Sequence, residues 1–317
     1  MKNLDIKLGR AAGYYQIGQR QNQEDARYPD TDHPSGTQRC FIVCDGVGGL
    51  DKGEVASSTV AKAMGEFIGH YDLSREFTVT DLAYALNAGY DALEKVNRGA
   101  SLGMATTLTL LVAHAGGIMV AHIGDSRIYQ IRPGVGVVFR TYDHSLVNVM
   151  VRNGMISPED AINHPKSNVI TRCMGGSNPG ERSEATTMNI TDVLPGDVFL
   201  LCSDGVLHEI TDADLASLVD TRKPVDEMAA ILAEHTAGST DNNTAFLVPV
   251  QSVGGVDFET MTKQLEENAA AADPDAEPAE GVDTRIIEPA EPVAEEVTAQ
   301  HKPGAKEKLT GWFSNFF

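Results

Sequence analysis

Aspartates recur where apolar segments of this chain end. Asp45 follows CFIVC and begins DGVGG, Asp125 follows GIMVAHIG, and Asp204 follows DVFLLCS. Asp241 lies just before the last apolar segment. A single aspartate after a strand is an ordinary turn residue, but several carboxylates at one sheet edge would repel one another and raise each other's pKa values. A hard divalent cation removes that conflict, so the pattern predicts Mg²⁺ or Mn²⁺ bound by oxygen ligands.

Two further features fit such a site. The acidic pair Glu24-Asp25 lies near the start of the chain, and Gly46 beside Asp45 would let a backbone carbonyl approach a metal. Two hard cations about 3.5–4 Å apart polarise a phosphoryl oxygen and supply hydroxide near neutral pH. The chain contains neither GxxxxGK[ST], the phosphate loop of many NTPases, nor the serine motif GxSxG. The residues alone therefore favour a metal-assisted phosphoester hydrolase.

The elements that must position these residues are short strands and a few helices. Alternating or continuous apolar residues predict strands at 40–44, 106–115, 117–123, 127–131, 137–142, 197–202 and 244–250. Helical periodicity predicts helices at 54–70, 81–96, 212–220 and 225–237. Strands that come in runs favour antiparallel sheets with helices packed outside. The predicted fold class is α+β.

The last part of the chain has a different composition. Residues 254–317 hold 14 acidic and five basic residues, five prolines and few apolar side chains, which predicts an acidic Pro/Ala-rich disordered tail. Residues 306–317 end this tail with four aromatic residues. They are expected either to bind a docking partner or to fold back on the body of the protein. The docking candidates are Trp312, Phe313, Phe316 and Phe317.

Composition and charge exclude several classes of protein. The 317 residues carry a formal net charge of −20, which opposes binding to nucleic acid or to an anionic membrane surface. There is no apolar run of the ~20 residues that a membrane span needs. The four cysteines, Cys40, Cys44, Cys173 and Cys202, form no CxxC pair and are expected to be free thiols in a reducing compartment. We expect a cytoplasmic protein.

Seven motifs occur in an order that resembles one known family. They are RQNQEDA, VCDGVGG, GMATTL, HIGDSR, DHS, LLCSDG and TDNNTA. Together they resemble the signatures of the PPM family, the type 2C metal-dependent protein Ser/Thr phosphatases, in a bacterial form, over about residues 10–250. The resemblance implies a four-layer α-β-β-α sandwich of two antiparallel sheets flanked by helices. It also implies a catalytic domain at 1–253, with a variable flap at about 145–190.

The resemblance implies roles for individual residues. Asp45 would bridge two Mg²⁺ or Mn²⁺ ions, Asp204 and Asp241 would hold the first, and the carbonyl of Gly46 would serve the second. Glu24 and Asp25 would also serve the second ion, through water. Asp125 would belong to a third, weaker position. Arg20 would bind the phosphate, for which a guanidinium is well suited. A metal-bound hydroxide would then attack phosphorus in line.

The sequence departs from the family pattern at three positions. Val47 stands where many eukaryotic members have a histidine that is proposed as general acid, and His144 in DHS is a substitute candidate, although that motif more often serves structure. Leu50 stands where some bacterial members have a histidine. His208 replaces an acidic residue expected four positions after Asp204, which weakens the case for a third metal.

The expected activity is removal of phosphate from Ser/Thr of phosphorylated proteins, reversing a bacterial Ser/Thr kinase. The alternative is a phosphatase-like binding module that recruits phosphoproteins through its C-terminal tail. Intact metal aspartates favour the enzyme. A two-metal nuclease is disfavoured by the net charge.

Overall fold

Two antiparallel sheets form the centre of the structure. A computed structural model describes residues 4–47, 52–98, 103–162, 164–175, 182–220 and 223–271, without the side chains of 265–271. One sheet has the order β1-β11-β10-β7-β8, and β2 and β12 also pair with β11. Its strands are β1 (Ile6–Leu8), β2 (Ala12–Gln16), β7 (Arg127–Arg132), β8 (Gly136–Arg140), β10 (Val198–Cys202), β11 (Asn243–Val253) and β12 (Val256–Asp257).

The second sheet has five strands in the order β3-β4-β5-β6-β9. They are β3 (Asp25–Tyr28), β4 (Cys40–Asp45), β5 (Leu108–His114), β6 (Gly117–Ile123) and β9 (Thr186–Ile190). The strands predicted from apolar runs are all present, with ends shifted by a few residues. β1, β2, β3, β9 and the two-residue β12 were not predicted. The structure also differs from the predicted flap at 186–190, where β9 pairs with β6.

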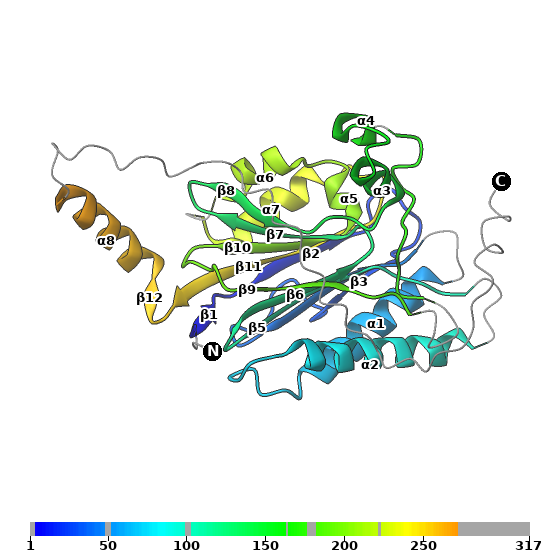
Figure 1. The fold of residues 1–317 in the computed structure, drawn as a ribbon, viewed down its shortest axis with the longest axis horizontal. Coiled ribbons are helices and arrows are strands. Elements are labelled where there is room, and N and C mark those ends of the chain that lie inside the picture. Colours follow the sequence, from blue (N-terminus) through cyan, green and yellow to red (C-terminus); the bar gives the residue numbers. More distant parts are fainter. Residues whose placement is uncertain are drawn as a thin grey trace. The chain divides into compact units, whose positions relative to one another are not determined.

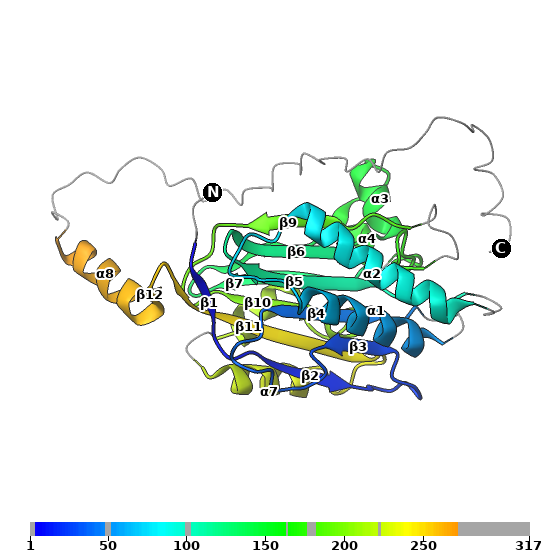
Figure 2. The same cartoon turned by 90° about the horizontal axis from the view of Figure 1, so that it is seen from below.

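Helices cover the outer faces of both sheets, which confirms the predicted four-layer sandwich (Figure 1). α1 (Gly53–Ile68) and α2 (Val79–Asn97) lie side by side across the five-stranded sheet (Figure 2). α5 (Asp204–Leu207), α6 (Asp212–Leu218) and α7 (Val225–His235) cover the other sheet. α2 begins with a capping box in which Thr78 and Asp81 exchange hydrogen bonds.

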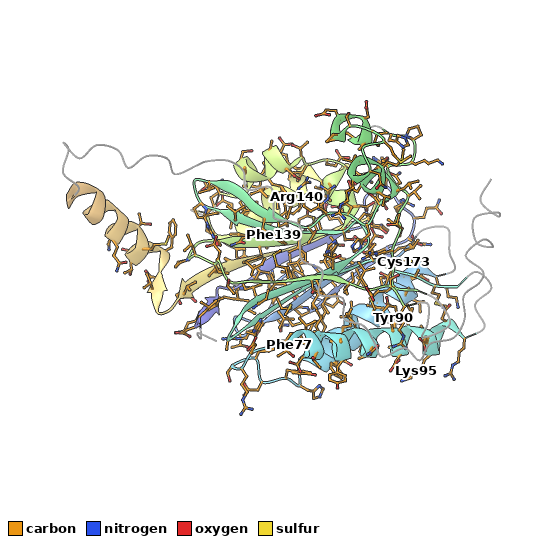
Figure 3. All side chains as sticks on the ribbon, viewed as in Figure 1. Phe77, Tyr90, Lys95, Phe139, Arg140 and Cys173 are labelled. Carbon is orange, nitrogen blue, oxygen red and sulfur yellow. The ribbon has the colours of Figure 1, made fainter. Side chains whose placement is uncertain are left out.

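Three apolar clusters fill the three spaces between the four layers. The middle cluster lies between the sheets, and there the Phe41 and Phe246 rings meet edge to face at 5.5 Å. A second cluster joins the five-stranded sheet to α1 and α2 and includes Phe77 and Tyr90, which are labelled in Figure 3. The third joins the other sheet to α6 and α7. Burial of both faces of each sheet holds the strand ends in fixed places.

Strand alternation determines which side chains enter the space between the sheets. Phe41 and Val43 of β4 belong to the middle cluster, so Asp45 has the same inward parity. Leu201 of β10 also points inward, and the backbone stays extended through Ser203, which therefore shares that side. The inner faces thus carry polar residues just beyond their apolar ones.

The segment predicted as a flap begins with two short helices, α3 (Leu146–Arg152) and α4 (Pro158–Ile162). α3 starts at Ser145, whose side chain accepts a hydrogen bond from the Asn148 N–H. In the later part of this segment, Arg182 lies 2.8 Å from Glu94 of α2 and above the Tyr90 ring. The later part of the segment is therefore held against α2.

Regular structure continues past the predicted domain boundary at 253. β12 pairs with the end of β11, and α8 (Phe258–Ala271) follows. The prediction of disorder is therefore wrong for these residues, because the run of Glu and Ala after Leu265 favours a helix. By contact density the chain divides into the units 1–268 and 269–317. The aromatic end at 306–317 lies outside the described residues. Among the described helices, none has the length and apolar character that crossing a bilayer requires.

Candidate metal centre

The strand registers bring the predicted aspartates to one edge of each sheet. Asp25 at the start of β3 pairs directly with Asp45 at the end of β4. In the other sheet, the end of β10 lies beside the start of β11, so that Cys202 pairs with Ala245. The aspartate that precedes β11, Asp241, therefore lies next to the one that follows β10. Like charges directly opposite each other in a sheet are destabilising, so these edges call for a compensating cation.

Asp45 is at the centre of this group. Burial raises the pKa of its carboxyl well above the usual value, and the charges of Asp204, Asp25 and Asp125 raise it further. Asp45 of one sheet therefore lies close enough to Asp204, at the edge of the other sheet, for their charges to interact.

Asp125 belongs to the same group. It follows β6, and its pKa is raised to about 8, chiefly by burial and then by the charges of Asp204 and Asp143. Asp204, on the first turn of α5, also has a raised pKa, with burial as the main cause. Three carboxyl groups with raised pKa values at one place are typical of a functional site.

Asp241 and Arg20 form the outer side of the group. Arg20 Nη2 donates a hydrogen bond of 2.6 Å to Asp241 Oδ2, and the side chains are 50% and 23% exposed. This bond raises the pKa of Arg20, with burial opposing it and the charges of Asp241, Glu24 and Asp204 adding to it. The structure thus brings the predicted phosphate-binding arginine to the carboxylates from a distant part of the sequence.

Glu24 and Asp25 have different surroundings although they are neighbours. Glu24 is partly exposed, and its pKa is raised mainly by burial while the Arg20 charge opposes the shift. Asp25 is 2% exposed, and burial raises its pKa to about 7. Its Oδ2 accepts a hydrogen bond from Ser203. The sequence analysis gave both residues the same role, whereas in the structure Asp25 is buried and Glu24 is partly exposed.

Gly46 occupies a place that admits no side chain. A Cβ added there would lie 2.5 Å from the Gly53 backbone and 2.8 Å from the Glu24 carbonyl oxygen. The Gly46 N–H donates to that same carbonyl at 3.0 Å. The glycine after Asp45 therefore allows the first residue of α1 to approach the end of β4 closely.

These residues suit hard divalent cations. Asp25 Oδ1 and Asp204 Oδ1 are buried oxygen atoms with no hydrogen-bond partner, which is costly unless a cation or water takes that place. Converging carboxylate oxygens are the ligands that Mg²⁺ and Mn²⁺ prefer. As placed, no three His, Cys, Asp or Glu side chains in the described parts of the chain form a finished ion-binding group. Arg20 holds Asp241 instead. A cation would thus have to draw the carboxylates together.

The surroundings of His144 indicate a structural role and not that of a general acid. Its Nδ1 accepts the Gly124 N–H at 3.2 Å, and its Nε2 lies 2.8 Å from Thr186 Oγ1. Burial, the stacked His122 ring and nearby arginines lower its pKa to about 3. A neutral imidazole with both nitrogens engaged cannot protonate a leaving group. Val47 offers no proton either, and Leu50 lies outside the described residues. His208 Nε2 is 3.8 Å from Asp204 Oδ2.

Several residues around the carboxylates belong to the seven motifs, although the sequence analysis predicted no function for them. Asn242 uses its whole amide, accepting from the Glu24 N–H at 2.8 Å and donating to the Ile17 and Asn22 carbonyls at 2.9 and 3.0 Å. It therefore holds the loop that carries Arg20 and Glu24. The signal was available in TDNNTA, where an asparagine follows the aspartate, but its partners lie more than 200 residues away in sequence.

The hydroxyl groups of two threonines hold the Asp45 backbone. The Thr107 hydroxyl accepts the Asp45 N–H at 2.9 Å and lies 2.8 Å from the Ser126 hydroxyl, next to Asp125. The Thr106 hydroxyl donates to the Asp45 carbonyl at 2.8 Å. These contacts explain why threonines and a serine occupy GMATTL and GDSR.

A cavity of about 180 Å³ between β2 and α7 contains none of the predicted site residues.

Comparisons with known proteins agree with this geometry. The family model described as Protein phosphatase 2C matches residues 12–245. The serine/threonine phosphatase stp of Listeria innocua is 30% identical over 223 residues, which are 67% of this chain and 84% of that protein. Protein phosphatase PhpP of Streptococcus pneumoniae is 32% identical over 215 residues, covering 66% of this chain and 84% of that protein.

Solved structures show the same fold. The serine/threonine phosphatase PstP/Ppp of Mycobacterium tuberculosis has a TM-score of 0.65 at 31% identity, over 76% of this chain and 98% of that one. A catalytic domain of PstP in complex with two manganese ions has a TM-score of 0.60 at 30% identity, over 77% and 98%. Stp1 of Staphylococcus aureus has a TM-score of 0.66 at 26% identity, over 80% and 98%.

Proposed function

This chain belongs to the protein phosphatase 2C family, and we propose that the carboxylates at the sheet edges are its metal ligands. It is a metal-dependent serine/threonine protein phosphatase. The observation that supports the proposed site most strongly is the group formed by Asp45, Asp125 and Asp204: burial raises the pKa of all three carboxyls, and the charge of Asp204 raises the pKa of Asp45 and of Asp125 further. Such a group is costly without a cation.

We assign the ligands as follows. Asp45, Asp204 and Asp241 would hold the first cation, and Asp45 together with the Gly46 carbonyl would hold the second. Glu24 and Asp25 serve the second position through water, and Asp125 serves a third, weaker one. When bound, Mg²⁺ or Mn²⁺ supplies Lewis-acid polarisation of a phosphoryl oxygen and a more acidic water. The manganese of one structural neighbour supports this choice without deciding between the two metals.

Arg20 binds the phosphate monoester. Half of its side chain is exposed and it lies beside Asp241, so a phosphate at the carboxylate edge meets a planar guanidinium. In this structure, without substrate, Arg20 donates a hydrogen bond to Asp241. Transfer of that guanidinium from Asp241 to the phosphate would leave the Asp241 oxygen free for a cation.

The substrates we propose are phosphoserine and phosphothreonine side chains on proteins phosphorylated by a bacterial Ser/Thr kinase. A cytoplasmic location is supported by Cys40, Cys44, Cys173 and Cys202, which are all free thiols. A docking role for the aromatic residues 312–317 stays a prediction. The binding-module alternative is not favoured, because relatives along most of the chain are named as phosphatases.

The proposal is tested by calorimetric titration with Mn²⁺ together with hydrolysis of p-nitrophenyl phosphate. The wild type should bind about two ions per chain and lose turnover in EDTA, and Asp45→Asn should lose both binding and turnover. Arg20→Ala should keep Mn²⁺ binding but raise KM, and Arg20→Lys should recover part of the loss. Unchanged Mn²⁺ binding in folded Asp45→Asn would show that the metals are held elsewhere.

A further inference from the structure

Ser203 lies where three parts of the metal centre meet. It ends the extended backbone of β10, directly before Asp204, and it is fully buried. Strand alternation places it on the inner side of its sheet. Asp25, at the edge of the opposite sheet, is the acidic residue that it reaches.

The Ser203 hydroxyl makes two hydrogen bonds and has no contact with solvent. It donates to Asp25 Oδ2 at 2.8 Å and accepts the Thr244 N–H at 3.0 Å. Thr244 belongs to β11 and in turn accepts the Ser203 N–H through its carbonyl at 3.0 Å. Two strands of one sheet and one strand of the other are thereby joined at a single oxygen atom.

A serine at this position has an ordinary use that it does not serve here. Ser203 is the N-cap residue of α5, where a serine side chain commonly accepts a backbone N–H of the first turn. In this structure it makes no such capping bond. The hydroxyl is directed to Asp25 instead, so capping does not explain the choice of residue.

The contact with Ser203 leaves Asp25 with one occupied and one free oxygen. Oδ2 is held by the serine, whereas Oδ1 is buried with no hydrogen-bond partner. The charges of Asp204 and Asp241 act on this carboxyl, so it faces the same group of ligands. A donor that fixes one oxygen determines the direction in which the other can bind a cation or its water.

We propose that Ser203 is a positioning residue of the metal centre, whose hydroxyl locks the Asp25 carboxylate and joins it to the ligand Asp204 across the two sheets. This inference rests on the proposed metal-binding function. Residues that orient metal ligands in this way typically change metal affinity by about 10- to 100-fold when they are removed.

The test compares Ser203→Ala with Ser252→Ala by Mn²⁺ calorimetry on the full chain. Ser252 is a nearly buried serine at the opposite end of β11 and serves as the matched control. Ser203→Ala should bind Mn²⁺ about 10- to 100-fold more weakly, whereas Ser252→Ala should match the wild type. Thermal unfolding in EDTA checks that both variants are folded. If Ser203→Ala does not fold, Ser203→Cys replaces it, since a thiol is a weaker hydrogen-bond donor of similar shape.

A double-mutant cycle with Asp25→Asn distinguishes positioning from a general structural role. Because the proposed effect passes through the Asp25 carboxylate, Ser203→Ala should weaken Mn²⁺ binding by less than about twofold in the Asp25→Asn background. Equal losses in both backgrounds, or wild-type affinity in Ser203→Ala, would overturn the inference. Failure of the wild type itself to bind Mn²⁺ would instead overturn the proposed function.

Discussion

Two aspartates flank β10, and their surroundings are opposite. Asp197, just before the strand, is fully buried, yet each of its oxygens has a partner. Arg132 donates to both oxygens at 3.0 Å, Gln130 donates to Oδ2 at 2.7 Å, and the Leu194 N–H donates to Oδ2 at 2.9 Å. Asp204, just after the strand, has an unpartnered Oδ1 and faces other carboxylates.

The difference separates a structural carboxylate from a functional one. A buried charge that is fully hydrogen-bonded and paired stabilises one arrangement of the chain and has no capacity left for a ligand. A carboxylate that has one buried oxygen without a partner and lies among like charges keeps that capacity, at a cost to stability. The same strand therefore carries a structural residue at one end and a proposed ligand at the other.

Replacement of Asp204 should give the largest effect on activity. Asp204→Asn removes one charged metal ligand, and a bound metal contributes several kcal/mol to transition-state stabilisation, so turnover of p-nitrophenyl phosphate should fall by about a thousandfold or more. Stability in EDTA should stay equal or rise, because one of several repelling charges is gone. The comparison would fail if Asp204→Asn kept activity or if it unfolded the metal-free protein.

The matching change at the other end should reverse this pattern. Asp197→Asn leaves the mostly buried Arg132 with only the exposed Asp192 carboxylate, 3.3 Å away, as a charged partner, and places an amide donor against its guanidinium. Removal of one member of a buried ion pair costs about 3–5 kcal/mol, so urea unfolding should show a loss of that size. Mn²⁺ affinity of the folded fraction should not change. A loss below about 1 kcal/mol would mean that the Asp197 network adds little to the fold.

The sequence singled out Asp204 through the motif LLCSDG, but it did not show that Asp197 is fully paired. Both flank the apolar run that predicted β10, and the difference depends on Arg132 and Gln130 in β7, more than 60 residues away. The ligand candidates themselves were predictable, because carboxylates at strand ends follow from the local pattern and from the motif order. Their hydrogen-bond partners depend on sheet pairing, which local patterns do not encode.

The fold shows the same limit. Continuous apolar runs predicted the central strands β4, β5, β6 and β10 correctly. β3 was missed because it carries the charged residues Asp25 and Arg27, of which Asp25 is hydrogen-bonded to Ser203 and Arg27 is paired with Asp32 and lies over the Phe246 ring. β2 was missed because it is short and contains Gly13, which the adjacent Phe246 ring requires. Tertiary contacts overrode local preference at the strands nearest to the site.

The pH dependence of stability should sharpen the comparison with a smaller effect. Folding raises the pKa of Asp25 to about 7 and of Asp125 to about 8, from an ordinary value of about 3.9. The native state therefore binds more protons than the unfolded state between these values. Their contribution is fully present below about pH 4 and is lost as pH rises through 7 and 8.

Thermal unfolding in EDTA from pH 5 to 9 measures this effect. The melting temperature should fall as pH rises, and the fall should be smaller in Asp125→Asn, which has one titrating group fewer. Mn²⁺ should reverse the trend, since a cation binds the deprotonated carboxylates and its protection grows with pH. A melting temperature independent of pH in EDTA would contradict the raised pKa values.

The smallest effect on activity is expected when the acidic residues near the C-terminal end of the chain, far in sequence from β10, are removed. Residues 272–317 hold ten acidic and four basic residues, and their deletion leaves β12 and α8 intact. At 0.15 M salt the Debye length is about 8 Å, so kcat/KM for a small phosphate ester should change by less than about twofold. At 0.01 M salt, where it is about 30 Å, loss of this negative charge should raise kcat/KM for the anionic substrate. A large loss at both salt concentrations would show that these residues complete the site. If the deletion has only this small effect, the number of acidic residues in the chain does not determine activity. What distinguishes Asp204 from the other acidic residues is then the set of partners around its carboxylate.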